Sequence, residues 1–369
     1  MKKLKVMTIL GTRPEIIRLS ETIKTCDQAF NHLLVHTEQN YDFSLSDVFF
    51  KTLSLRQPDY FLDTSKGSAL GTRLGQVIEK TYKVMYREKP DAVIILGDTN
   101  SSLAAIAAKR LKIPIFHLEA GNRCHDENVP EMCNRRIVDH IADINVAYTE
   151  QAKDYLLQEG LNPLRVFVSG TPLLELYSKY QEDIMKSHIL KDLDLEPKQY
   201  IVLSMHREEN IDQKTTFKSL IQAINEIAER YRLPVIFSAH PRTKKQLEEN
   251  KITMHELVHI MTPLSYFDYM KLQQNAFVVL SDSGSVTEEC QIAAFPAVLI
   301  RTSTERPEGI DWGNIVLGGV SSKGIINAIE IVKNQTIFAH QYQGLSFSKT
   351  IVSLVQGYTE VINQEVWKK

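Results

Sequence analysis

Short, almost continuously apolar runs recur along this chain, each followed by a polar loop and then an amphipathic segment. Asp91–Leu96 is the clearest of them, because an almost continuously apolar run is typical of a central parallel strand that is buried on both faces. Similar runs at Leu4–Leu10, Ile113–Leu118 and Asp143–Ala147 alternate with helical patterns. This alternation predicts a parallel sheet that is covered by helices on both faces.

The alternation occurs twice. A charged, largely helical stretch from Thr171 to about Pro197 separates the first series from a second one, which begins with a predicted strand at Tyr200–Leu203. We therefore predict an α/β protein with two doubly wound, Rossmann-like domains, at residues 1–170 and 171–349. A cleft between two such domains is the usual place for a small-molecule site.

Composition narrows the class of partner and the compartment. The net charge is −2, which argues against nucleic acid as the main partner. The four cysteines form no CxxC pair, so neither a zinc site nor a disulfide scaffold is indicated, and a reducing cytoplasm fits best. The amino-terminal apolar run is too short for an export signal, and no apolar segment approaches the roughly 20 residues of a membrane-spanning helix. We expect a cytoplasmic protein without a membrane span.

Carboxylates follow the predicted strands of the first half. Asp98 comes after the strand Asp91–Leu96, Glu119 ends the next strand, and Glu131 opens a helix near Pro130. In open α/β sheets the carboxyl ends of the strands form the ligand-binding edge, so all three are candidate acid/base groups. The alternative for Asp98 is a helix cap, although the three residues after it can cap equally well. The alternative for Glu131 is an acidic residue favoured in the first turn of a helix.

The first predicted strand ends in a glycine turn, Gly11–Glu15, that opens a helix expected from about Ile16 to Lys24. Backbone N–H groups at the start of a helix can face an anion, and Arg13 and Arg18 would strengthen that attraction. A plain turn with solvated arginines is an equally good interpretation of so short a motif.

Four loops of the second half carry polar side chains after predicted strands. His206–Asn210 and His240–Arg242 combine histidine with arginine, although a single histidine at a strand end is more often only structural. Ser281–Glu289 has small residues that let phosphate oxygens approach the N–H groups at a helix start, but it fits neither nucleotide-binding glycine motif, so ATP and NAD are not indicated. Thr304–Glu308 adds a further cationic loop.

Eight short motifs occur in a fixed order across nearly the whole chain. They are GTRPE at 11–15, GDT at 97–99, EAG at 119–121, PE at 130–131, HREEN at 206–210, DSGS at 282–285, EE at 288–289 and TERPE at 304–308. Their joint order resembles the non-hydrolysing UDP-N-acetylglucosamine 2-epimerase family. The resemblance implies a glycosyltransferase-B arrangement, with the last helix, 350–369, crossing back onto the first domain. It also implies no cofactor, no required metal and a homodimer.

The resemblance further implies a reaction and a set of residues. UDP leaves C1 as the C2 proton is removed, which gives a glycal, and UDP then adds back while C2 is protonated on the other face. Motif matching makes Asp98, Glu119 and Glu131 the proton-transfer carboxylates, with His206 stabilising the diphosphate. The residues expected to bind the UDP-activated 2-acetamido sugar are Arg13, Arg18, Arg123, Arg207, His240, Ser283, Gly284, Ser285, Glu289 (for the ribose) and Arg306.

Two departures from the family pattern bear on substrate and regulation. The loop EAGNRCHDENVPE at 119–131 looks like the capsule and O-antigen branch that makes UDP-N-acetyl-L-fucosamine from its 2-acetamido-2,6-dideoxy-L-talose epimer. We expect that reaction, with UDP-N-acetylglucosamine to UDP-N-acetylmannosamine as the alternative. The allosteric segment TGQH is replaced by Thr37–Asn40, which weighs against activation by UDP-N-acetylglucosamine. A glycosyltransferase of the same fold, a hydrolysing relative and a non-catalytic UDP-sugar sensor are the remaining alternatives.

Overall fold

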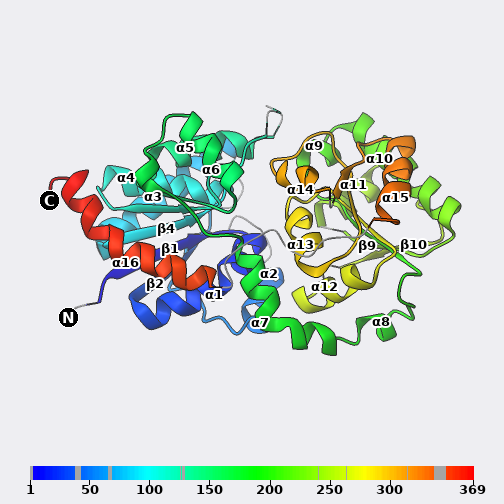
Figure 1. Cartoon of the computed structure of the whole chain (residues 1–369), viewed down its shortest axis with the longest axis horizontal. Helices are drawn as coiled ribbons and strands as arrows, with labels where there is room; N and C mark the ends of the chain where they lie inside the picture. Colours follow the sequence, from blue (N-terminus) through cyan, green and yellow to red (C-terminus); the bar gives the residue numbers. More distant parts are fainter. Residues whose placement is uncertain are drawn as a thin grey trace. The chain divides into compact units, whose positions relative to one another are not determined.

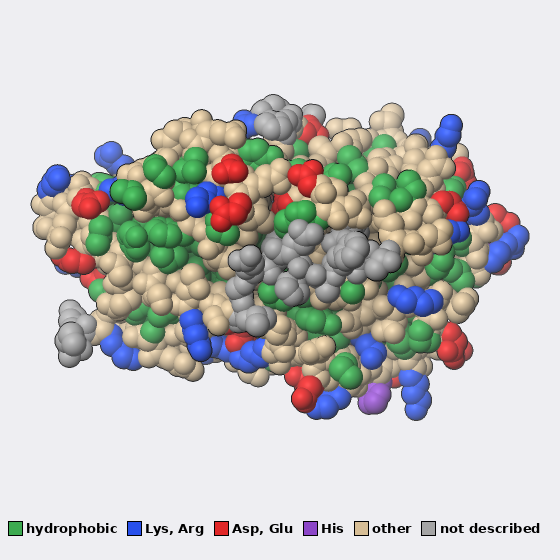
Figure 2. Space-filling model, viewed as in Figure 1, with side chains coloured by type: hydrophobic (Ala, Val, Ile, Leu, Met, Phe, Trp, Pro, Cys, Tyr) green, Lys and Arg blue, Asp and Glu red, His purple; other side chains and the backbone are tan. Residues whose placement is uncertain are grey.

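The chain forms two compact units, which are described separately. The computed structural model describes residues 3–37, 43–64, 69–124, 126, 129–239, 241–262, 264–313, 315–335 and 346–369. The first unit contains Met1–Arg123, Val129–Ser178 and Tyr342–Lys369, and the second contains Cys124–Asn128 and Lys179–Gln341. Figure 2 shows acidic and basic side chains interspersed over the visible face, as the small net charge leads one to expect.

The first unit is built on a parallel sheet. Among the described residues it has seven strands, in the order β3-β2-β1-β4-β5-β6-β7. Figure 1 labels three of them, β1, β2 and β4. The strands are β1 (Lys5–Leu10), β2 (Asn31–His36), β3 (Tyr60–Phe61), β4 (Ala92–Leu96), β5 (Ile115–Leu118), β6 (Ile144–Ala147) and β7 (Val166–Val168). Every residue of β4 is buried, as its uninterrupted apolar run predicted.

Helices cover the sheet of the first unit. They are α1 (Arg13–Ala29), α2 (Phe43–Thr52), α3 (Leu70–Glu88), η1 (Asn100–Leu103), α4 (Ala104–Arg110), α5 (Glu131–Ile141), α6 (Glu150–Gln158), η2 (Pro163–Arg165) and α16 (Phe347–Glu365). Helix α7 (Pro172–Lys186) begins in the first unit and ends in the second. One core cluster packs Met7 of β1 and Val93 of β4 against Met85 of α3 and Ala108 of α4. The last helix, α16, contacts α1.

Helix α1 is longer than the sequence suggested, because it begins at Arg13 rather than near Ile16 and continues to Ala29. Its start is set by Thr12 at the N-cap and by Glu15, whose carboxyl group accepts the N–H of Thr12 at 2.8 Å. The polar residues of GTRPE thus belong to the helix start rather than to a preceding loop.

The second unit repeats the plan. Within the described part of the chain its sheet has six parallel strands in the order β10-β9-β8-β11-β12-β13. The strands are β8 (Ile201–Ser204), β9 (Val235–Ser238), β10 (Val258–Met261), β11 (Val278–Ser281), β12 (Ala297–Leu299) and β13 (Ile315–Leu317). The helices are α8 (Ile189–Asp192), α9 (Glu208–Ile211), α10 (Lys214–Tyr231), α11 (Pro241–Glu249), α12 (Tyr266–Asn275), α13 (Ser285–Ala293), α14 (Glu308–Asp311) and α15 (Ser322–Val332).

The prediction of an α/β protein with two parallel, helix-covered sheets is confirmed. The sequence interpretation missed the outer strands β3 and β13, which have only two and three residues. Within the ranges given above, no helix combines the length and apolar character needed to cross a membrane.

Candidate active site

Two of the predicted acid/base carboxylates meet at the carboxyl edge of the first sheet. Asp98 follows β4 and Glu119 follows the neighbouring strand β5. Arg135 of α5, which is 1% exposed, contacts both: its Nη2 atom lies 2.5 Å from Asp98 Oδ2 and 3.2 Å from Glu119 Oε1. One buried guanidinium therefore fixes the positions of both carboxylates.

Glu119 is held from a second side by helix α1. Arg18, which is also buried, places its Nη1 atom 3.4 Å from Glu119 Oε2, and its guanidinium carbon lies 5.8 Å from the ring centre of Tyr148. The sequence predicted Arg18 as a substrate contact, and the structure places it beside a candidate acid/base carboxylate.

The backbone at Glu119 is unusual. Its φ of 62° lies in the left-handed region, which costs a non-glycine residue about 1 kcal/mol or more. Arg135 also donates a hydrogen bond to the carbonyl oxygen of Glu119, which helps to hold this conformation. Such strain in a residue beside two arginines is typical of a functional site.

Glu131, the third predicted carboxylate, is the first residue of α5, four residues before Arg135. Residues four apart lie on the same face of a helix, so Glu131 shares a face with the arginine that binds Asp98 and Glu119. Asn134 of the same helix donates to the carbonyl oxygen of Asp98 at 3.0 Å. Helix α5 therefore carries Glu131 together with Asn134 and Arg135, the two side chains that contact Asp98.

The loop before α1 is tied to the loop after β4 through Glu15. Its carboxyl group accepts hydrogen bonds from the N–H groups of Gly11 (3.0 Å) and Thr12 (2.8 Å) and contacts the hydroxyl of Ser101. Burial raises the pKa of Glu15 to about 7, although these hydrogen bonds act in the opposite direction. The neighbouring Arg13 lies over the ring of Phe49, with 5.7 Å from its guanidinium carbon to the ring centre.

Arg123, another predicted substrate contact, is 4% exposed and engages two carboxylates of the first unit. Its Nη1 atom lies 2.6 Å from Asp139 Oδ2, and its Nη2 atom lies 2.6 Å from Glu159 Oε2. The structure therefore places Arg123 in a buried ion-pair network behind the loop that follows Glu119.

In the second unit, Asp282 fixes the loop after β8. This fully buried carboxylate accepts the N–H groups of His206 at 3.0 Å and Arg207 at 2.9 Å, and the side-chain amide of Asn210 at 3.1 Å. The ring nitrogen Nδ1 of His206 lies 3.4 Å from Asp282 Oδ1, and the His206 side chain remains about one-third exposed at 34%.

Three arginines of the second unit surround one buried carboxylate, Glu305. Arg207 and Arg301 each approach it to 2.8 Å, and Arg306 approaches it to 3.0 Å. Burial raises the pKa of Glu305, but the three guanidinium charges outweigh that effect and hold its pKa well below the usual range. Arg306 also contacts Glu288 at 2.8 Å. The cationic loops predicted from the sequence therefore contain their own counter-charges.

The small residues after β11 lie at the start of α13, with Gly284 as its N-cap. The hydroxyl oxygens of Ser283 and Ser285 are 3.0 Å apart. Glu289, predicted to bind ribose, accepts a hydrogen bond from the side-chain amide of Gln273 at 2.9 Å.

His240 and the segment 38–40 that bears on allosteric regulation lie outside the described residues.

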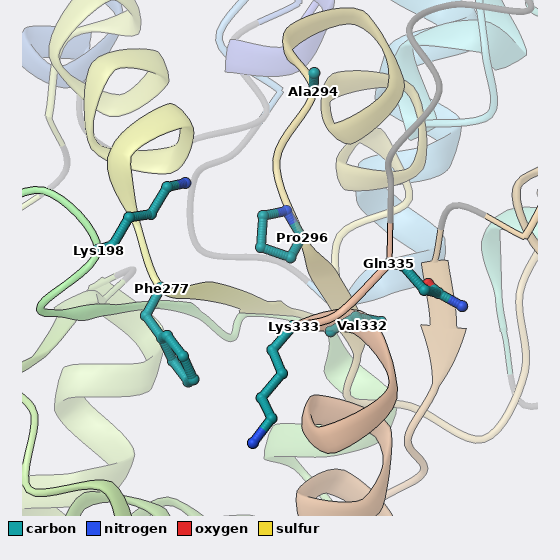
Figure 3. A pocket seen from close by; sticks show the side chains of 7 residues that line it. All are labelled: Lys198, Phe277, Ala294, Pro296, Val332, Lys333 and Gln335. Atoms are coloured by element: carbon teal, nitrogen blue, oxygen red, sulfur yellow. The ribbon is translucent and has the colours of Figure 1, made fainter.

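A cavity of about 380 Å³ lies elsewhere in the second unit (Figure 3). Its lining includes Phe277, which precedes β11, and Pro296, which precedes β12, together with Lys198 and Lys333. These positions put the cavity at the amino ends of the strands, whereas the loops of His206 and Ser283 leave the carboxyl ends. The cavity is therefore not part of the candidate active site.

Comparison with known proteins shows the family to which the chain belongs. Residues 24–352 match the model of a family described as UDP-N-acetylglucosamine 2-epimerase. The chain belongs to this family. The epimerases of this family are isomerases, so the predicted family and enzyme class are both confirmed.

Three similar proteins show how far the likeness extends. The structure of a UDP-N-acetylglucosamine 2-epimerase from Rickettsia bellii is 43% identical, with a TM-score of 0.91 and coverage of 100% of both chains. That of the Methanocaldococcus jannaschii epimerase in complex with UDP-GlcNAc and UDP is 35% identical, with a TM-score of 0.91 and coverage of 96% of this chain and 99% of the other. The UDP-2,3-diacetamido-2,3-dideoxy-D-glucuronate 2-epimerase of Pseudomonas aeruginosa is 32% identical over 339 residues, which are 90% of this chain and 94% of the relative.

The sequence analysis missed several residues that position side chains at the carboxyl edges of the two sheets. Arg135 had a signal, since its spacing of four from Glu131 in a predicted helix places both on one face. Asp282 lies inside a recognised motif but was not singled out. Glu15 and Glu305 lie inside the motifs GTRPE and TERPE but were not singled out, and their contacts with Ser101 and Arg207 come from distant parts of the chain.

Proposed function

We propose that this protein interconverts the C2 epimers of a UDP-activated 2-acetamido sugar. The observation that carries the proposal is that Arg135 holds Asp98 and Glu119 together at the carboxyl edge of the first sheet. Inversion at C2 needs proton donors and acceptors on two faces of the ring, and paired carboxylates on separate loops suit that task.

In the proposed reaction a carboxylate removes the C2 proton. The electrons of the broken C2–H bond form a C1–C2 double bond, while the C1–O bond breaks and its electrons leave with UDP. UDP then adds back to C1 of the glycal as C2 takes a proton on the opposite face. We assign the proton transfers to Asp98, Glu119 and Glu131, and stabilisation of the leaving diphosphate to His206.

The second unit contributes nucleotide recognition in this proposal. The backbone N–H groups and serine hydroxyls at the start of α13 suit phosphate oxygens, and Glu289 suits ribose hydroxyls. The remaining predicted contacts, which stay proposals, are Arg13, Arg18, Arg123, Arg207, His240, Gly284 and Arg306. A homodimer is likewise proposed from the family resemblance, and a cytoplasmic location from the cysteine pattern.

Two sugars are candidates for the substrate. The loop sequence at 119–131 supports the 2-acetamido-2,6-dideoxy-L-talose and N-acetyl-L-fucosamine pair. The names of several relatives support UDP-N-acetylglucosamine and UDP-N-acetylmannosamine instead. The Pseudomonas aeruginosa relative, named for a third 2-acetamido sugar, supports variation of the sugar within one fold.

The test is an NMR assay of each purified UDP-sugar with the enzyme in heavy water. We expect deuterium to enter C2 of substrate and product, and to do so faster with one of the two sugars. A glycosyltransferase or a UDP-sugar sensor would bind the nucleotide and leave C2 undeuterated. Absence of deuterium with both sugars, and with the diacetamido glucuronate, would contradict the proposed function.

A further inference from the structure

A buried histidine and a buried aspartate contact the loops that carry Asp98 and Glu119. His117 of β5 and Asp139 of α5 are each 0% exposed, and Nδ1 of the ring lies 2.8 Å from Asp139 Oδ1. Neither side chain reaches the surface where a substrate would bind. Any effect of this pair on catalysis must therefore act through the residues it contacts.

The imidazole ring extends the pair to the loop that carries Asp98. Its other nitrogen, Nε2, lies 2.8 Å from the carbonyl oxygen of Gly97, the residue just before Asp98. A carbonyl oxygen only accepts hydrogen bonds, so Nε2 must donate here. The turn at Gly97 has a φ of 68°, and the imidazole hydrogen bond fixes this turn.

The other end of the pair holds the loop that carries Glu119. Asp139 Oδ2 accepts the N–H of Gly121 at 3.3 Å and the Nη1 of Arg123 at 2.6 Å. Burial raises the pKa of Asp139, but the hydrogen bond from His117 and the charges of His117, Arg123 and Arg135 outweigh it and keep the pKa below its usual value. Asp139 is therefore an anionic acceptor for all of these donors.

The spacing of these contacts explains what they do. His117 comes two residues before Glu119 and Gly121 comes two residues after it, so Asp139 binds the chain on both sides of the strained residue. A left-handed φ at a glutamate persists only where the surroundings hold it in place. The same pair of side chains also reaches the backbone next to Asp98.

We propose that His117 and Asp139 form a positioning pair that sets the geometry of both Asp98 and Glu119 for proton transfer at C2. The proposal rests on the proposed epimerase function for its kinetic consequence. Its structural part, that one pair anchors two loops, can be tested without any substrate.

The kinetic test compares two substitutions of the carboxylate. Asp139→Leu removes every hydrogen bond that the Asp139 side chain accepts, and we expect kcat for C2 deuterium exchange to fall about 10- to 100-fold per UDP-binding chain, with KM and the Kd for UDP within about twofold. Asp139→Asn keeps an acceptor for Gly121 and donates to the ring, so we expect it to restore most of the rate. A rate for Asp139→Leu within about twofold of the native enzyme would overturn the proposal.

Asp143 provides a matched control at the other end of strand β5. It is also buried, accepts the N–H of Ile115 at 3.0 Å and pairs with Lys109 at 2.6 Å. Asp143→Leu should lower stability but leave kcat per UDP-binding chain unchanged. An equal loss of kcat in both leucine variants would show that any buried carboxylate beside β5 has this effect, and would overturn the assignment.

A second variant keeps the proposal testable if Asp139→Leu does not fold. In His117→Asn the amide reaches the Nδ1 position and keeps the contact with Asp139, but it cannot reach the carbonyl of Gly97. We expect faster backbone hydrogen exchange at 97–100 than in the native protein, and little change elsewhere in β4. Unchanged exchange at 97–100 would overturn the proposal, even if the native enzyme shows no C2 exchange and the proposed function itself fails.

Discussion

The carboxyl edges of the two sheets use the same charged groups in opposite roles. In the first unit a buried cation, Arg135, lies between the carboxylates Asp98 and Glu119. In the second unit a buried carboxylate, Glu305, lies among arginines that include Arg207 and Arg306. The first edge therefore presents positioned carboxylates, and the second presents positioned guanidinium groups.

The difference indicates that the two units, although similar in fold, have different chemical roles. Carboxylates held by a cation suit proton transfer, whereas arginines held by a carboxylate are already desolvated and oriented before a phosphate binds. Arg135 and Glu305 are both buried and ion-paired, so removing either side chain leaves a buried charge without its partner. Substitutions at corresponding places in the two units can test these roles.

The largest effect should come from the first edge. Replacing Glu119 with glutamine keeps the size of the side chain and removes its proton-accepting charge, so we expect C2 deuterium exchange to fall about 10²- to 10⁴-fold. The Kd for UDP, measured by calorimetry, should stay within about threefold, because we assign nucleotide recognition to the second unit. If Glu119→Gln weakened UDP binding as strongly as it slowed C2 deuterium exchange, the assignment of proton transfer to the first unit and nucleotide recognition to the second would be wrong.

The central cation of the first edge should matter next. Arg135→Met leaves Asp98 and Glu119 without their shared partner, and breaking a buried ion pair in this way costs roughly 3–5 kcal/mol of unfolding free energy. Urea unfolding of the variant measures this cost. Arg301→Met in the second unit is the matched comparison, since Arg301 is equally buried and contacts Glu305 and Glu209. We expect only the Arg135 variant to lose C2 exchange beyond its loss of folded protein.

The partners of Arg135 show which part of the site the sequence could not predict. Apolar runs such as Asp91–Leu96 predicted the parallel sheets, because burial on both faces of a strand leaves a local pattern. The carboxylates could be picked out because strand ends in such sheets converge on one edge. Contacts between distant parts of the chain leave no local pattern: Arg135 meets Asp98 across 37 residues, Glu15 meets Ser101 across 86, and Arg207 meets Glu305 across 98.

Glu305 should give the second unit a characteristic response to pH. Its pKa is lowered on folding, so it contributes stability above the unfolded pKa of about 4.5, and that stability is lost as the pH falls further. Glu305→Gln should therefore cost about 3 kcal/mol at pH 7 and progressively less below pH 4.5. Urea unfolding at a series of pH values tests this, and a cost that does not shrink in acid would contradict the role of the charge.

Glu15 in the first unit should respond in the opposite direction. Its pKa is raised on folding to about 7, so the native state binds the extra proton and stability falls as the pH rises from about 4.5 to 7. Because the slope is about 1.4 kcal/mol per pH unit, Glu15→Gln should remove a loss of up to about 3 kcal/mol over that range. Parallel pH curves for the native protein and the variant would show that Glu15 does not carry this proton.

The smallest effect should come from Gly284, at the start of α13. Its backbone is right-handed, with a φ of −64°, so alanine adds no backbone strain there. An added Cβ atom would overlap side-chain atoms of Glu305 and Arg306, which must then move. We expect Gly284→Ala to weaken UDP binding about tenfold, or about 1.4 kcal/mol, while C2 exchange at saturating substrate stays nearly unchanged. Gly75→Ala, at a place where nothing lies within 4 Å of the new atom, serves as the control. If Gly284→Ala lowered kcat but left UDP affinity intact, the guanidinium edge would take part in the proton transfer and the contrast between the two units would have to be abandoned.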